Sequence, residues 1–182
     1  MTNVKLGNAE ISISVILIAI GALVALISLF MGYVNMEFLS YPDWEKITLS
    51  GTDVISRTID GMEGGFQKDS WSFVHWAPLF TVIFAFIGLI LAIIPMFAKL
   101  PVKKKVYNII VAAVLVISVI FAIVFVAIGA GAGLFTGEAA EGIKFAIENE
   151  YAKMSLGAGA IVGIIGAIIA LVGAGIAVKE SL

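Results

Sequence analysis

The sequence predicts an all-α integral membrane protein: a left-handed bundle of four transmembrane helices with both termini in the cytoplasm and a small extracellular cap from the first outer loop. Two observations predict this fold. The 182-residue chain contains four long apolar runs without an acidic or basic residue, at residues 11–33, 76–98, 106–134 and 156–178. The chain is also 61% hydrophobic and only 13% charged, whereas a typical soluble domain has about 25% charged residues.

Each apolar run is long enough to form a membrane-spanning helix, which needs about 20 residues. A backbone inside lipid must satisfy its hydrogen bonds in a helix or a closed barrel, and these runs lack the alternation of barrel strands. The first run is too long for the core of a signal peptide, so we expect a retained span. No room is left for a separate soluble domain, so residues 1–182 are expected to form one membrane domain.

The short loop at residues 99–105 predicts the orientation of the bundle. Four of its seven residues are lysines, and short loops rich in Lys and Arg stay on the cytoplasmic side. We expect the protein to lie in the cell (plasma) membrane. Four spans then place both termini in the cytoplasm and residues 34–75 and 135–155 outside. We interpret Lys103, Lys104 and Lys105 as residues that contact anionic lipid headgroups at the inner interface, and a specific site for a lipid headgroup is the alternative.

Tryptophans mark the predicted outer interface. Trp44, Trp71 and Trp76 lie in sequence near span ends, where amphipathic rings suit the headgroup level. We expect them to anchor the protein at the membrane surface, and an aromatic platform for a ligand is the alternative. Acidic residues outnumber basic ones in both outer loops, seven to three in residues 34–74 and four to two in residues 135–155, so the outer face is expected to be acidic.

Small residues at heptad spacing indicate where the predicted helices pack. Span four contains Gly159, Gly163, Gly166, Ala170, Gly173 and Ala177, and span one contains Gly21, Ala25, Ser28 and Gly32. Lipid offers no hydrophobic drive between helices, so close backbone approach must supply the attraction, and a 3.5-residue period favours crossings of about +20°. Two interpretations stay open: the stripes form the protein's own core, or part of the span-four surface contacts another protein chain.

The first outer loop is predicted to fold into the cap. Residues 45–49 alternate between polar and apolar side chains as a strand does. Ser50 and Asp53 have the spacing of a capping box, which begins a helix, and an apolar face continues to Met62. The second outer loop has helical spacing from Ala139 to Met154, which fits either an interfacial helix or an outward extension of span four.

The sequence contains no catalytic, cofactor or metal-binding motif. His75 is the single histidine and there is no cysteine, so the usual ligands of a zinc site are missing. Asp60 and Glu63 have the spacing of paired acid-base or calcium-binding carboxylates, although a solvated acidic surface explains them as well. The spans lack the buried charges that transporters and proton pumps use. The net charge of −2 gives no sign of nucleic-acid binding.

The layout of four spans, a long first outer loop and a short basic inner loop is similar to that of claudin-like and other tetraspan membrane proteins. The resemblance covers the whole chain as topology. The paired cysteines of the claudin first loop and the Cys-Cys-Gly of the tetraspanin large loop have no counterpart in this chain. Cysteine-free loops and a high isoleucine content suggest a prokaryotic origin.

Three functions are compatible with these features. The leading hypothesis is a non-enzymatic scaffold or small accessory subunit of a larger membrane assembly, which acts through Gly/Ala-rich helix faces and an acidic outer cap. Its partners would be the lipid bilayer and either further copies of the chain or other membrane subunits. The first alternative is a homo-oligomeric channel or pore. The second is a small integral-membrane enzyme, which would need Asp60, Glu63 or His75 clustered over a pocket.

Overall fold

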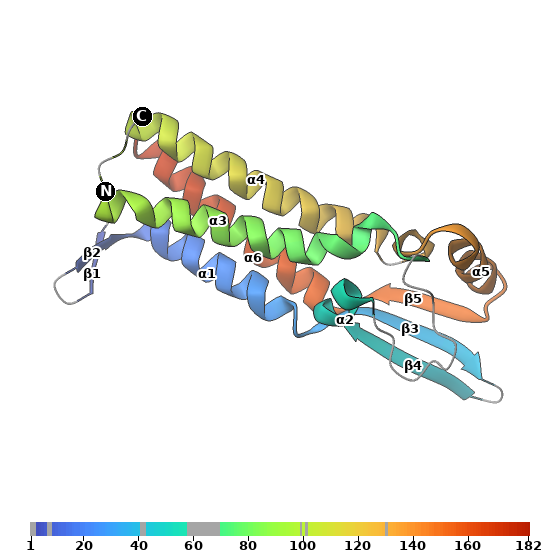
Figure 1. The fold of residues 1–182 in the computed structure, drawn as a ribbon. Coiled ribbons are helices and arrows are strands. Elements are labelled where there is room, and N and C mark those ends of the chain that lie inside the picture. The colour runs from blue at the N-terminus through green and yellow to red at the C-terminus, as the bar shows by residue number, and fades with distance from the viewer. Residues whose placement is uncertain are drawn as a thin grey trace.

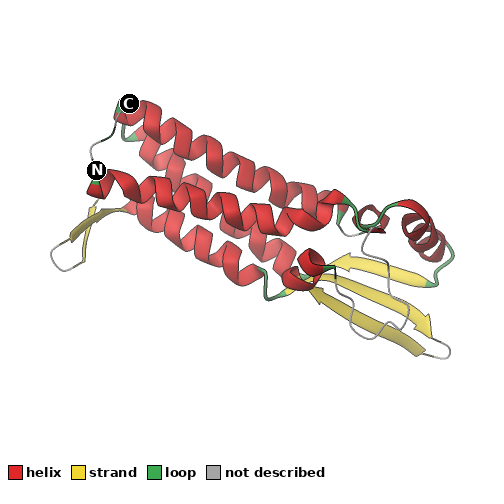
Figure 2. Ribbon diagram, in the orientation of Figure 1, coloured by secondary structure: helices red, strands yellow, loops and turns green. Residues whose placement is uncertain are grey.

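Four long helices lie side by side, and a three-stranded sheet with two shorter helices projects from one end of them (Figure 1). This computed structural model describes residues 3–6, 9–40, 43–57, 70–98, 100, 102–129 and 131–182. Both ends of the chain lie at the end of the helices remote from the sheet (Figure 1). The described chain is mostly helical, and its strands lie at the two ends of the helices (Figure 2).

Three predicted spans are confirmed as helices long and apolar enough to cross a membrane. They are α3 (Ala77–Phe97), which follows one 3-10 turn, η2 (Phe73–Trp76), then α4 (Lys104–Ile128) and α6 (Ala158–Lys179). α4 ends before the predicted residue 134, and a separate 3-10 turn, η3 (Ala132–Leu134), follows. The physical reason is the glycine-rich sequence after Ile128, because glycine loses more backbone freedom in a helix than any other residue.

The first predicted span, residues 11–33, is wrong at both ends. Helix α1 (Ile13–Ser28) has 16 residues, which corresponds to about 24 Å, less than a ~30 Å hydrocarbon layer. The Ser12 hydroxyl accepts a hydrogen bond from Val15 N at 3.4 Å and so caps the start of the helix. After a turn at residues 29–31 the chain becomes strand β3 (Gly32–Ser40), so Gly32 belongs to a strand and not to a helical stripe.

Helices α1 and α6 run antiparallel and pack backbone against backbone. A methyl group added at Gly166 would lie 2.6 Å from Ala25 N, and one added at Gly21 would lie 2.5 Å from Gly166 O. Further along the same contact, a methyl group at Gly173 would lie 2.7 Å from Ser14 O. Glycine at these positions therefore sets how closely the two helices approach each other, and a larger residue would push them apart.

Polar side chains connect α3 and α4 at two levels. Tyr107 Oη on α4 donates a hydrogen bond to Leu91 O on α3 at 2.7 Å. Leu91 is four residues before Pro95, which has no N–H to donate to that carbonyl, so the tyrosine supplies the missing donor. α3 can therefore continue past its proline. Nearer the middle of the helices, Ser118 Oγ donates to Thr81 O at 2.7 Å.

The cap contains an antiparallel sheet in the order β4-β3-β5, which corrects the all-α prediction. β3 pairs on one side with β4 (Asp43–Ser50) and on the other with β5 (Ala152–Leu156). β5 comes from the second predicted outer loop, so the first loop does not form the cap alone. Because β3 follows α1 and β5 precedes α6, the antiparallel helix pair continues as an antiparallel strand pair (Figure 1).

Two shorter helices complete the cap. α2 (Gly51–Ser56) confirms the capping box, because Ser50 Oγ accepts from Asp53 N at 3.2 Å and Asp53 Oδ2 accepts from Ser50 N at 2.8 Å. It ends before Met62, and residues 58–62, over which the apolar face is predicted to continue, lie outside the described residues. α5 (Gly137–Glu148) is separated from α6 by β5, so the alternative in which span four extends outward as one helix is wrong.

A hairpin at the opposite end of the bundle was not predicted. Strand β1 (Asn3–Leu6) pairs antiparallel with β2 (Ala9–Ser12), and β2 leads directly into α1. The hairpin explains why α1 begins at Ile13 and not at residue 11, because residues 11 and 12 pair with the neighbouring strand.

The backbone contact between α1 and α6 gives a stability prediction with a matched control. We expect Gly21→Ala to lower the free energy of unfolding by about 1–3 kcal/mol, because the new methyl group overlaps backbone atoms of α6. Gly175→Ala is the control, since a methyl group there would meet no atom within 4 Å. Thermal unfolding in detergent compares the two variants, and equal stability would contradict the packing described here.

The tyrosine–proline pair predicts non-additive energetics. Tyr107→Phe leaves the Leu91 carbonyl without its donor, so we expect the free energy of unfolding to fall by about 1 kcal/mol in the wild-type background. In a Pro95→Ala background the new backbone N–H can reach the same carbonyl, and the loss should shrink towards zero. A double-mutant cycle measured by thermal unfolding tests this coupling. An identical loss in both backgrounds would show that the tyrosine does not compensate for the proline.

Candidate functional site

Two buried aromatic side chains with polar atoms lie at the junction between the helices and the cap. His75 is 5% exposed, and its Nδ1 is hydrogen-bonded to Ser72 O. Trp71 packs against Phe135 with ring centroids 5.0 Å apart. Within the described part of the chain, His75 Nε2 and Trp71 Nε1 have no hydrogen-bond partner. The single histidine is thus a packed residue of the junction.

Of the three residues considered for chemistry, the structure describes His75. Asp60 and Glu63 lie outside the described residues, so their grouping with His75 stays a prediction. In the ranges that the structure describes, no three His, Cys, Asp or Glu side chains come together in a way that could hold a metal ion.

The predicted membrane anchors occupy three different environments. Trp71 lies inside the junction, and Trp76 is partly buried before α3, with its ring centroid 6.5 Å from that of Phe80. Trp44 is the second residue of β4 and is 40% exposed. β4 begins at the end of the sheet remote from the helices (Figure 1). Lys103, Lys104 and Lys105 lie at the opposite end of the bundle and are exposed.

The small residues predicted to form a helix-packing interface meet one another within this chain. The buried members are Gly159, Gly163, Gly166, Ala170 and Gly173 on α6, and Gly21, Ala25 and Ser28 on α1. Ala177 is partly buried, and its carbonyl accepts a hydrogen bond from Asn108 Nδ2 on α4 at 2.8 Å. Gly157 meets the backbone of Gly32, whereas Gly175 faces open space. Most of the smooth surface of α6 is therefore used by α1.

The sheet has one apolar face and one polar face. The strand register places Val34 opposite Leu49 and Leu156, and Met36 opposite Ile47 and Met154, so apolar side chains from all three strands share one face. This face belongs to the core of the cap together with residues of α5 and η3. The intervening residues form the other face, which we call the outer face of the cap.

Polar pairs fill most of the outer face of the cap. Lys46 Nζ lies 3.4 Å from Glu37 Oε1, and Thr48 Oγ1 donates to Asn35 Oδ1 at 3.0 Å. These pairs lie between neighbouring strands and are exposed, so each contributes little to stability. Their effect is to keep this part of the face hydrated.

An apolar cluster interrupts the outer face at its far end. We call Leu39, Trp44 and Tyr151 the tip cluster. Leu39 lies directly opposite Trp44 in the strand register, and its backbone N–H donates to Tyr151 O at 2.9 Å. The three side chains are 40%, 40% and 55% exposed. Lys153 Nζ lies 4.4 Å from the centroid of the Trp44 ring, a cation–π contact that orients the ring.

The β4 edge of the sheet has a different character from the tip cluster. β4 pairs with β3 on one side, and no strand in the described residues pairs with its other side. Glu45 and Lys46 place charges on this strand, a common means of preventing edge-to-edge aggregation. The tip cluster is therefore the more apolar of these two surfaces.

Sequence reasoning missed the tip cluster, although a signal was present. Val34, Met36 and Phe38 alternate with Asn35 and Glu37, which is the pattern of a half-buried strand. This stretch directly follows the apolar run at residues 11–33, whose length and hydropathy predict a helix. The alternation that starts at residue 34 is enough to predict β3. The pairing of β3 with β5, which brings Tyr151 beside Leu39, has no counterpart in the local sequence.

Comparison with known proteins does not assign the chain to a family. No family model matches the sequence, and no curated protein matches it.

Proposed function

We propose that the chain is a non-enzymatic four-span membrane protein, a scaffold or small accessory subunit of a larger membrane assembly, which binds a neighbouring membrane protein through the outer face of its cap. The tip cluster is the observation that carries this proposal. Exposed aromatic side chains grouped on an otherwise polar surface are typical of protein contact sites. Residues of β3 and β4 hold two of its members in fixed register, so the surface is already formed before a partner arrives.

Apolar side chains on the outside of all four long helices support a membrane setting. Half or more of the side-chain surface is exposed at Leu23 and Ile27 on α1, Ile90 on α3, Ile120 on α4 and Ile161 on α6. In water such a surface would promote aggregation, whereas in lipid it needs no cover. The bundle is therefore proposed to lie in the bilayer with this surface against acyl chains.

Helix α1 is proposed as the fourth span despite its length. A short span is accommodated when the bilayer thins locally or when flanking residues extend the apolar surface. Phe30, two residues beyond the end of α1, is 72% exposed and extends that surface towards the cap. Four crossings place both termini on one side, and the lysines at that end of the bundle favour the cytoplasm.

The polar groups inside the bundle favour a contact role over a pore. Ser28 Oγ donates to Ala25 O at 2.7 Å, Thr81 Oγ1 donates to Ala77 O at 2.9 Å, and Ser118 Oγ also donates to a backbone carbonyl. These buried hydroxyls satisfy the backbone of their own helices or of a neighbour, so they do not line an open polar path. A conduit would have to form between several copies of the chain.

The orientation can be tested by single-cysteine labelling, because the native chain has no cysteine. We expect Thr48→Cys, on the outer face of the cap, to react with a membrane-impermeant maleimide on intact cells. Lys103→Cys should react only after the cells are permeabilised. If Lys103→Cys reacted on intact cells and Thr48→Cys did not, the orientation would be the reverse of the one proposed. If both variants reacted from the same side, the proposed crossing of the bilayer would be contradicted.

The contact role predicts that the tip cluster holds a partner. Native mass spectrometry of the protein extracted mildly from its own membrane should show a mixed complex. We expect the double variant Leu39→Ser/Trp44→Ser to lose the partner, because an apolar contact surface is replaced by a hydrated one. Phe145→Ser is the matched control, since Phe145 is 62% exposed on α5 and lies outside the tip cluster.

The same measurement separates the proposed function from its alternatives. A closed homo-oligomer would favour the channel and would direct attention to solute flux in liposomes. A mixed complex that survives the double variant would show that the partner binds elsewhere, and a monomer would contradict the accessory role altogether.

A further inference from the structure

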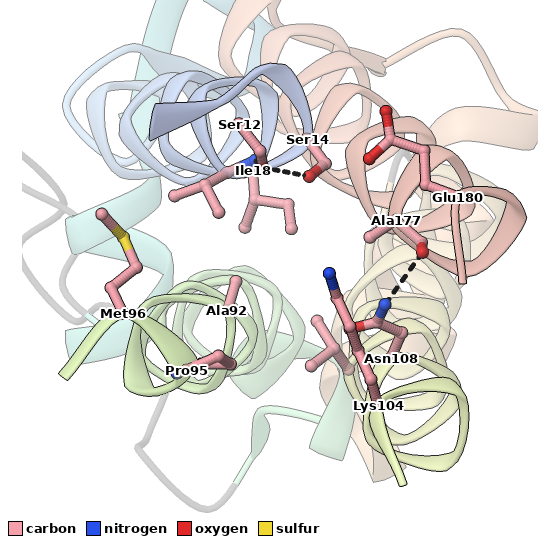
Figure 3. A pocket seen from close by; sticks show the side chains of 12 residues that line it. Ser12, Ser14, Ile18, Ala92, Pro95, Met96, Lys104, Asn108, Ala177 and Glu180 are labelled. Atoms are coloured by element: carbon pink, nitrogen blue, oxygen red, sulfur yellow. Dashed lines mark hydrogen bonds between the residues drawn. The ribbon is translucent and has the colours of Figure 1, made fainter. Parts of the chain in front are cut away.

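A cavity of about 260 Å³ lies between the helix ends opposite the cap. All four long helices line it, near the starts of α1 and α4 and the ends of α3 and α6 (Figure 3). It is smaller than the roughly 300–1,000 Å³ of sites for drug-sized ligands. A cavity of this size suits a headgroup-sized ligand.

The lining of the cavity is polar on two sides. Ser12 Oγ and Ser14 Oγ, from the start of α1, are 2.5 Å apart and hydrogen-bonded. Asn108 on α4 donates one amide hydrogen to Ala177 O at 2.8 Å, which fixes its side chain against α6. Figure 3 shows the Lys104 ammonium group projecting from α4 into the space between these groups.

The charges around the cavity favour an anion close to α4. Helix dipoles largely offset one another here, because two helices begin and two end at this level. The side chains therefore set the local sign. Lys104, which is exposed, places a positive charge at the α4 side of the lining, and Lys103 and Lys105 are its neighbours in sequence. Glu180 contributes a carboxylate on the α6 side of the lining, so an anion should bind away from it (Figure 3).

The polarity of the lining changes along α4 from its first turn inwards. Lys104, Asn108 and Val111 follow one another on successive turns, so charge gives way to an amide and then to an apolar side chain. On α1 the serines likewise give way to Ile18, which is 1% exposed. A phosphate ester has this same order, an anionic group followed by ester oxygens and carbon.

We propose that this cavity binds the phosphate group of a phosphate ester, supplied either by a phospholipid headgroup or by a small soluble ester. Lys104 is the cationic partner of the phosphate, and Asn108 offers its second amide hydrogen. The hydroxyls of Ser12 and Ser14 are further donors at the opposite wall. Charge-assisted hydrogen bonds of this kind are about twice as strong as neutral ones. The site is independent of the tip cluster and of any partner that the cap binds.

Binding to the purified full-length protein in an uncharged maltoside detergent tests the proposal. The probes are dioctanoyl phosphatidic acid, dioctanoylglycerol, which has the same chains without the phosphate, and glycerol 3-phosphate. We expect Lys104→Gln to weaken phosphatidic acid binding at least tenfold, because the cation that faces the phosphate is lost. We expect Glu180→Gln to strengthen binding, because it removes the carboxylate of the lining, and Lys104→Arg to retain it.

Lys103→Gln and Lys105→Gln are matched controls, because they remove the same charge at neighbouring positions that do not line the cavity. Binding of phosphatidic acid alone, with the Lys104 dependence, identifies a lipid headgroup. Binding of glycerol 3-phosphate with the same dependence identifies a soluble ester. The proposal is overturned if phosphatidic acid does not bind, if dioctanoylglycerol binds equally well, or if the control variants weaken binding as much as Lys104→Gln. If Lys104→Gln fails to fold, the opposite effect of Glu180→Gln decides.

Discussion

The backbone contact between α1 and α6 is the constraint on which the rest of the structure depends. Gly21 and Gly166 bring the two helices so close that neither position accepts a methyl group. The contact continues beyond the helices, where Gly157 N donates to Tyr33 O at 2.8 Å and β3 pairs with β5. One antiparallel pair of segments therefore runs through both the bundle and the cap, and it fixes the position of the sheet relative to the helices.

The polar groups of the bundle satisfy backbone groups that the helices leave unpaired. Pro95 leaves the Leu91 carbonyl without its helical donor, and Tyr107 on the neighbouring helix donates to it. Asn108 similarly connects α4 to the end of α6. These contacts join α4 to both of its neighbours at the end that contains the cavity, and they hold the polar wall of that cavity in place. Stability and the candidate binding site thus use the same side chains.

The two candidate sites lie at opposite ends of the molecule and have different chemistry. The tip cluster is an apolar surface on a hydrated sheet, suited to a protein. The cavity has polar groups from α1 and α4 among apolar side chains, and we propose that it binds an anionic group. Helices α1 and α6, which pack backbone against backbone, connect the two ends.

The sequence by itself determined the three long apolar helices and the capping box of α2, because hydropathy and local hydrogen bonding depend on residues close together in the chain. It also identified the small residues of α1 and α6, but not which surface they meet. Only the tertiary structure decided where α1 ends, since Gly32 and Tyr33 are as apolar as the helix before them and become a strand by pairing with segments far along the chain. The tip cluster and the cavity have the same origin. Each gathers side chains from distant segments, and pairing between distant segments leaves no periodic pattern in the sequence.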